Sequence, residues 1–188
     1  MMPRTIAFAM ATTLALAGCG KKDTAETGNL ASVNAMNAAS TAPVVALSAG
    51  QTFANAAAAS DAFEVASSTL ALTASSSASV KKFAQMMIDA HTKSTAKLKT
   101  AAAAASPAVV PDPSLNPDQQ TKLDALKAAT GSAFDQAYAA DQVAGHQQTL
   151  DALKAYAAAG DVATLKSFAT ELVPTVTAHL NMAKGLKI

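Results

Sequence analysis

The chain is poor in the residues that build disulfide frameworks and aromatic cores. Its 188 residues include one cysteine, no tryptophan and only 4% aromatic side chains. A single cysteine excludes an intrachain disulfide framework and any zinc site made of clustered cysteines. The scarcity of aromatic residues argues against a β-sandwich or β-barrel, because such folds are rich in aromatic and β-branched side chains.

Charge is also scarce, and it is balanced. Fourteen basic residues face thirteen acidic ones, the formal net charge is +1, and charged residues make up 14% of the chain. A protein that binds nucleic acid through electrostatics carries a basic patch or stripe. We therefore expect no nucleic-acid partner.

Alanine is abundant instead. Hydrophobic residues make up 51% of the chain, and 49 of the 188 residues are alanine. Alanine has the highest helix propensity and a small side chain, which favours closely packed helices. No segment shows the sustained alternation of a β-strand. The composition therefore predicts an all-α protein.

The N-terminus has the form of a processing signal. Arg4 provides a positive charge, and the apolar run 6–16 is too short to cross a bilayer as a helix. The run ends in Leu16-Ala17-Gly18-Cys19, which resembles the lipobox of bacterial lipoproteins. We expect residues 1–18 to be a lipoprotein signal peptide. The alternative is an ordinary signal peptide followed by a coincidental cysteine.

The lipobox resemblance implies a lipid anchor at Cys19. The cysteine would become the first residue after cleavage and carry acyl chains on its sulfur and on its amino group. Several acyl chains anchor a protein stably to a membrane. Gly20, rather than aspartate, follows the cysteine, which implies the outer membrane under the usual sorting rule, with the protein facing the periplasm. Residues 19–48 lack periodic large apolar groups and are expected to be a flexible tether.

The remainder, residues 49–188, is predicted to form one helical domain. Large apolar residues recur at intervals of three and four. The pattern predicts four long helices and one short helix, at 50–75, 78–104, 118–130, 132–159 and 161–186. Two tight connections imply antiparallel hairpins, and the long proline-rich connection implies one crossover. Together these features predict a ferritin-like four-helix bundle whose crossover carries the short extra helix.

Local signals mark several helix ends. Ser48 and Gln51 have the spacing of a capping box at the start of the first long helix. Gly160 is expected to end one long helix, and Asp161 to cap the next. Pro174 lies inside the last predicted helix and is expected to cause a kink or a local break.

The only three histidines, His91, His146 and His179, each fall on the apolar face of a different long helix. Counting from the turns at about 1.5 Å per residue places His91 and His146 near mid-bundle. The same count places Glu64 level with His91, and His179 a turn or more away. Inward imidazoles at this depth are candidates for a metal centre.

Carboxylates accompany these histidines. Asp61 and Glu64 share a helix face, and Asp135 lies three turns before His146. The candidate ligands for Fe, Mn or Zn are therefore Glu64, His91, His146, His179, Asp135 and Asp61. The Glu-x-x-His motif of ferritin-like dimetal sites is absent from the sequence. Two alternatives stay open: the histidines form a structural polar network, or they line a partly exposed groove.

The predicted helices carry a set of residues found together in one protein family. In this sequence they are Phe53, Asp61-x-x-Glu64, Val80-x-x-Phe83-Ala84-x-x-Met87-Ile88-x-x-His91, Gly131-x-x-Phe134-Asp135-x-x-Tyr138, His146, Gly160, Leu165-Lys166, Leu172-x-Pro174 and His179-Leu180. The chain thereby resembles the bacterial exported family called domain of unknown function 4142, a ferritin-like four-helix group. The resemblance implies the fold, the exported location and a proline in the last helix, but it implies no catalytic residues.

The sequence supports two functional hypotheses. The first is a non-enzymatic, lipid-anchored envelope protein that acts as a binding or stress-related interaction module. Its partners would be the membrane and an unidentified envelope protein or small ligand. The lipobox, the tether and the absence of a catalytic motif in the sequence favour it. The alternative is a ferritin-like metal-binding protein that uses the mid-bundle histidines and carboxylates.

Overall fold

The computed structural model describes residues 46–188. The predicted signal peptide, Cys19 and most of the predicted tether lie outside the described residues. The helices are α1 (Ala49–Ala74), α2 (Ala78–Ala103), α3 (Pro117–Ala128), α4 (Gly131–Ala159) and α5 (Ala163–Lys184). The described part contains no strand. The all-α prediction is confirmed, and each helix begins and ends within two residues of its predicted bounds.

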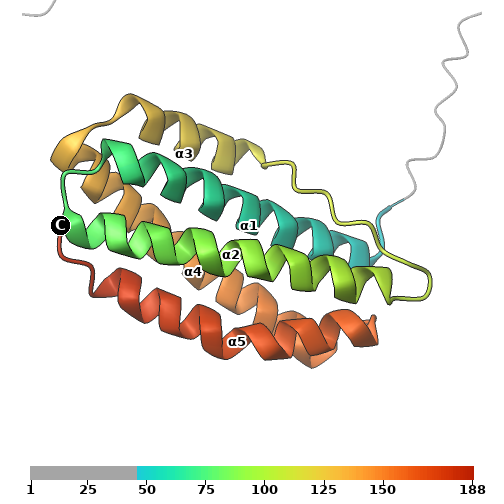
Figure 1. Cartoon of the computed structure of the whole chain (residues 1–188). Coiled ribbons are helices and arrows are strands. Elements are labelled where there is room, and N and C mark those ends of the chain that lie inside the picture. Colours follow the sequence, from blue (N-terminus) through green and yellow to red (C-terminus); the bar gives the residue numbers. More distant parts are fainter. Residues whose placement is uncertain (1–45) are drawn as a thin grey trace, which may run out of the picture. The chain divides into compact units, whose positions relative to one another are not determined.

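The four long helices form two hairpins that pack on each other (Figure 1). Helix α1 packs against α2 and α4, and α5 packs against α4 and α2. The connection between α2 and α4 runs back along the bundle and carries α3, which lies against α1 and α4. As a result α2 and α4 run in the same direction. One long crossover between two hairpins is the connectivity of ferritin-like bundles, as predicted.

Helix caps agree with the sequence at some ends and differ at others. The Ser48 side chain accepts a hydrogen bond from the Gln51 backbone N–H at 3.1 Å, as predicted. The Gln51 side chain does not complete a capping box, because it donates to Asn55 and to the Val110 carbonyl. A complete capping box instead starts α3, at Asn116.

The start of α5 also differs from prediction, and its interior excludes one of the two effects expected of Pro174, a local break. The N-cap of α5 is Val162 rather than Asp161, and Asp161 accepts a hydrogen bond from the Tyr156 hydroxyl at 2.8 Å. Pro174 does not break the helix. Proline has no backbone N–H, so the carbonyl of Thr170, four residues earlier, lacks its usual helical hydrogen bond. Thr170 lies on the exposed side of the helix, where water can bond this carbonyl.

The core consists of two apolar clusters with a polar layer between them. Along α1, α2 and α4 buried polar side chains separate the buried residues of the first cluster from those of the second, and on α5 His179 lies directly before Leu180, the last residue of the first cluster. The main members of this layer are Asp61, Glu64, His91, Gln142, His146 and His179. Burying polar groups costs free energy unless they are paired. The layer therefore marks the part of the bundle where function is to be sought.

None of the helices in residues 46–188 is long and apolar enough to cross a membrane.

Candidate metal centre

The three histidines converge at the middle of the bundle. Their side chains come from α2, α4 and α5, and the residues are 5%, 2% and 6% exposed in the order His91, His146, His179. The ring centroids are 5.5 to 5.7 Å apart. One nitrogen from each ring lies within 4.8 Å of the corresponding nitrogens of the other two. The prediction that these imidazoles turn inward is confirmed.

The His179 ring reaches the other two, although the sequence placed this residue a turn or more away along the bundle. Counted from the observed helix ends, His179 is 16 residues after Ala163 and His146 is 13 before Ala159. The remaining offset is about 4.5 Å along the axis. Side chains on a helix lean toward its N-terminus. In an antiparallel pair this lean brings His146 and His179 toward each other.

Each imidazole has a buried nitrogen that lacks a hydrogen-bond partner among the described residues. These atoms are Nε2 of His91, Nε2 of His146 and Nδ1 of His179. Leaving a buried polar atom unpaired costs about 1–3 kcal/mol. A bound ligand shared by the three nitrogens would remove this cost at all three positions at once.

The opposite nitrogens of two rings are held by oxygen acceptors. His91 Nδ1 lies 2.8 Å from Asp61 Oδ1, and Thr95 donates to the other oxygen of Asp61 at 3.2 Å. His146 Nδ1 lies 2.8 Å from the carbonyl oxygen of Gln142. These acceptors place a proton on Nδ1 of each ring, so Nε2 is the nitrogen that each ring can offer to a metal when it is neutral. Histidine ligands of metals are normally oriented by such contacts.

Two of these orienting residues were missed by sequence reasoning. Gln142 lies one turn before His146, and Thr95 lies one turn after His91. The spacing was visible in the sequence. Glutamine and threonine are common on helix surfaces, however, so no local signal singled them out.

Glu64 lies behind His146 and does not belong to the cluster. Its Oε2 accepts a hydrogen bond from the Gln142 side chain at 2.7 Å, and its Oε1 is 3.7 Å from His146 Nδ1, the nitrogen directed away from the other rings. Gly145 lies beside it, and a Cβ there would be in ordinary contact with Oε1 at 3.4 Å. Asp61 likewise contacts a histidine. Asp61 and Glu64, both predicted as ligands, therefore lie where they can orient the histidine rings and balance the charge of a bound ion.

Asp135 is not brought to the cluster. Its carboxylate accepts hydrogen bonds from the Ser75 and Ser76 hydroxyls at the turn between α1 and α2. The prediction had the correct face, but eleven residues correspond to about 16 Å along a helix axis. That separation places Asp135 near the end of the bundle.

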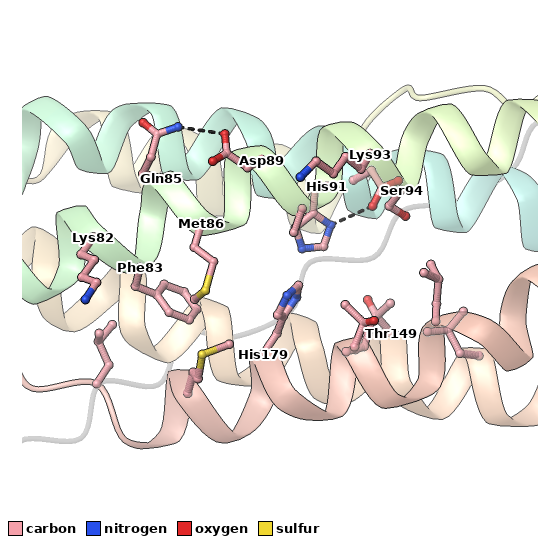
Figure 2. Close-up of a pocket in the computed structure, with 18 of the residues that line it drawn as sticks. Lys82, Phe83, Gln85, Met86, Asp89, His91, Lys93, Ser94, Thr149 and His179 are labelled. Carbon is pink, nitrogen blue, oxygen red and sulfur yellow. Dashed lines mark hydrogen bonds and ion pairs between the residues drawn. The ribbon is translucent and has the colours of Figure 1, made fainter.

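A groove between α2 and α5 reaches the cluster from the surface. It has a volume of about 1090 Å³. His91 and His179 line it, whereas His146 does not. Figure 2 shows the His91 and His179 rings facing one another across the groove, below Lys93. An ion held by the three rings would thus have its free side toward the groove.

Comparison with known proteins places the chain in a family. The family model described as Domain of unknown function (DUF4142) matches residues 32–186. The chain belongs to this family. No curated protein and no solved structure matches the chain. The resemblance noted in the sequence is confirmed, and because the DUF4142 description names no activity, function has to be argued from the site.

Burial and charge keep two of the three imidazoles of the DUF4142 cluster in the neutral form, whereas the third, His91, has to give up its proton to bind a cation. Burial and the nearby charge of His91 lower the pKa of His146 and of His179 to about 4, so both rings are neutral at pH 7. Burial also acts to lower the pKa of His91, but the hydrogen bond to Asp61 and the charge of Glu64 outweigh it, and the net pKa is raised. Burial raises the pKa of Glu64. Neutral imidazole is the form that binds metals.

The donor set fits one transition-metal ion. Three histidines with a free fourth position are typical of zinc sites that keep a water or substrate ligand. Imidazole also suits Cu, Fe and Ni, whereas Mn prefers carboxylates, so of the predicted ions Mn fits least. Nitrogens that share a tetrahedral zinc ion lie about 3.3 Å apart. The observed separations, within 4.8 Å, would have to close by up to about 1.5 Å.

Replacing Asp61 with asparagine is expected to lower Zn²⁺ affinity about 10- to 100-fold. The variant keeps the shape of the side chain but removes the negative charge that orients and polarises His91. Competition with a chromophoric chelator would measure the affinity. Asp151→Asn on the exposed face of α4 is the matched control. Equal affinities for the two variants would contradict a role for Asp61 at the site.

Acidification is expected to destabilise the metal-free domain between pH 6.5 and about 4. His146 and His179 titrate near 4 in the folded state and near 6.5 when unfolded. The unfolded state binds more protons in this window, so the free energy of unfolding falls as the pH falls. The raised pKa of His91 adds a stabilisation that is fully present below pH 6.5, so it does not change within this window.

Urea unfolding at pH 6.5 and 4.5 in the presence of a chelator would measure this effect. The double variant His146→Gln/His179→Gln is the comparison, since it lacks both groups. The raised pKa of Glu64 changes the free energy of unfolding in the opposite direction, but it does so in both proteins and largely cancels when they are compared. A wild-type loss no larger than that of the variant would contradict the prediction.

Proposed function

We propose that this DUF4142 protein binds a divalent transition-metal ion, Zn²⁺ being the first candidate, in a bundle held at the envelope by a lipid anchor. The observation that carries the proposal is the convergence of three buried imidazoles, with one nitrogen of each within 4.8 Å of the others, each of which has a buried nitrogen without a partner in residues 46–188. Asp61 and the Gln142 carbonyl hold two of the rings in the binding tautomer. Asp61 and Glu64 would balance the two positive charges of the ion.

A purely structural polar network is the main competing explanation. Such a network gains stability only when its members pair with one another. Here two of the rings are paired through Nδ1 to residues outside the cluster, and every ring keeps a buried nitrogen that no described residue pairs. This arrangement favours a ligand over a network.

The proposed activity is binding rather than turnover. Each carboxylate of the polar layer already bonds a histidine or a glutamine, which leaves neither facing the cluster as a general base. A purified protein that turned over a redox or hydrolytic substrate at this site would contradict that part of the proposal.

The test is metal content. The chain without residues 1–19, made with a tag free of histidine and purified without chelator, is expected to bind one Zn²⁺ per chain. These three histidines are the only ones in the sequence, so no other histidine can contribute non-specific metal binding. Less than about 0.1 ion per chain, unchanged after adding Zn, Fe, Mn or Cu, would refute the metal site.

The location is a separate part of the proposal, supported by the sequence of residues 1–19. The full chain is expected to incorporate labelled fatty acid and to fractionate with the outer membrane. Cys19→Ser should abolish labelling and release the chain from the membrane, because acyl chains provide the anchor. Gly18→Ala, which keeps a small residue before the cysteine, is the control. Labelling of the Cys19→Ser variant would refute the lipid anchor.

A further inference from the structure

The groove between α2 and α5 is an apolar channel. Large apolar side chains from both helices and from the segment after α5 line it, including Phe83, Met86, Phe168, Leu172, Val176 and Leu186. Its volume of about 1090 Å³ is at the upper end of the range of about 300–1,000 Å³ found for small-molecule sites. Such walls suit a hydrocarbon chain rather than a polar metabolite.

The C-terminal segment closes one end of this channel. Gly185, Leu186 and Lys187 line the groove after α5 ends. The hydroxyls of Ser77 and Ser79, at the start of α2, donate to the Lys187 carbonyl and hold the segment in place. The C-terminal segment is therefore a fixed part of the groove wall.

The polar part of the groove lies at its middle. His91 and His179 face each other there, each more than nine-tenths buried and each with a nitrogen that lacks a partner in the described chain. Only these two of the three rings line the groove. The free coordination position of an ion bound at the cluster would open into the same space.

The charges around the groove favour an anion. Four lysines line it, Lys82, Lys93, Lys97 and Lys187, against two aspartates, Asp61 and Asp89. Asp61 is bonded to His91, Asp89 accepts a hydrogen bond from Gln85, and Lys97 is paired with Glu171. In residues 46–188 the other three lysines have no ion-pair partner among the observed salt bridges. The excess positive charge selects for an anionic head group.

We propose that this groove binds a single-chain amphiphile with one carboxylate head group, a medium-chain fatty acid being the simplest example. The carboxylate occupies the fourth position of the ion held by the three histidines, and the tail lies along the apolar walls. Carboxylate oxygen is an ordinary zinc ligand. The inference rests on the proposed metal site and names the ligand of that site.

Calorimetric titration with decanoate and with decanol tests the head group. The protein is the chain without residues 1–19, so that no attached lipid or detergent competes. The Zn²⁺-loaded protein is expected to bind decanoate at least about tenfold more tightly than decanol, and more tightly than the metal-free protein does. Cobalt-substituted protein should change its visible absorption with decanoate and not with decanol, because only the carboxylate enters the coordination sphere.

Two matched pairs of variants test the groove itself. Ala90 lines the groove and Ala140 lies on the exposed face of α4. Ala90→Trp is expected to lower decanoate affinity at least about tenfold and to leave the Zn²⁺ stoichiometry unchanged, whereas Ala140→Trp changes neither. Lys93→Gln should weaken binding about threefold at low salt, and Lys154→Gln, outside the groove, should have no effect.

The outcomes separate this inference from the metal site. If Zn²⁺ binds but decanoate binds no better than decanol, or if Ala90→Trp behaves like Ala140→Trp, the amphiphile proposal fails and the metal site stands. If no metal loads, the proposed function fails. Decanoate binding that is the same with and without metal would overturn coordination of the head group. If the wild-type protein does not bind decanoate and Ala90→Trp changes the oligomeric state, the groove is assigned to a second copy of the chain.

Discussion

Replacing His146 with alanine is expected to weaken Zn²⁺ binding by at least about 100-fold. Structural zinc sites bind with about 10–16 kcal/mol shared among four ligands, so one ligand contributes about 3 kcal/mol. His146 is the most buried of the three rings and its inner nitrogen has no partner in the described residues. Competition with a chromophoric chelator would measure the loss.

Leu150→Ala is the matched control for this variant. Leu150 is buried, lies one turn further along α4, and belongs to the apolar cluster beside the polar layer. Its truncation opens a cavity of similar size without removing a nitrogen. If both variants bind Zn²⁺ equally well, His146 is not a ligand. If both lose binding together, the loss reflects unfolding, and circular dichroism at the assay temperature would show it.

His91 is less suitable for that test. Its ring is bonded to Asp61, and both residues are buried. Removing one partner of a buried charged pair costs about 3–5 kcal/mol, because the other charge is left uncompensated. The variant His91→Leu removes one partner of this pair. The Asp61 contact indicates that this variant loses stability as well as metal affinity.

Truncation of Phe83 to alanine is expected to destabilise the domain by about 3–5 kcal/mol. Phe83 is 4% exposed and belongs to the apolar cluster beyond the polar layer. Its ring packs edge-on against Tyr138, with centroids 6.3 Å apart. The variant loses this contact and leaves a cavity. Urea unfolding of the metal-free protein would measure the change.

An exposed apolar residue provides the comparison. Val110 is 75% exposed in the crossover, and Val110→Ala should change the free energy of unfolding by less than about 0.5 kcal/mol. A loss below about 1 kcal/mol for Phe83→Ala would mean that its ring is not part of the cooperative core. Unfolding midpoints measured at two protein concentrations would exclude a contribution from association.

Local sequence signals were sufficient for the helices. Alanine-rich segments with apolar residues at helical spacing became α1, α2, α4 and α5, and Ser48 and Gly160 mark two of the predicted ends. These signals act within a few residues, so they can be interpreted without a partner. The long crossover likewise follows from its prolines. Where prediction failed, as at Asp161, a competing side-chain partner, the Tyr156 hydroxyl five residues earlier, bonds the expected capping side chain.

The metal centre required more than local signals. The sequence supplied three histidines on three apolar faces, which is enough to predict inward imidazoles. It did not supply the relative depth of the three histidines along the bundle. It also did not show that Asp61 and Glu64 lie behind the rings, or that Asp135 lies far from the cluster. Those features depend on how antiparallel helices are staggered and on the direction in which each side chain leans. Helix periodicity specifies a face, whereas only packing between helices specifies a level along the axis, and a metal site needs both.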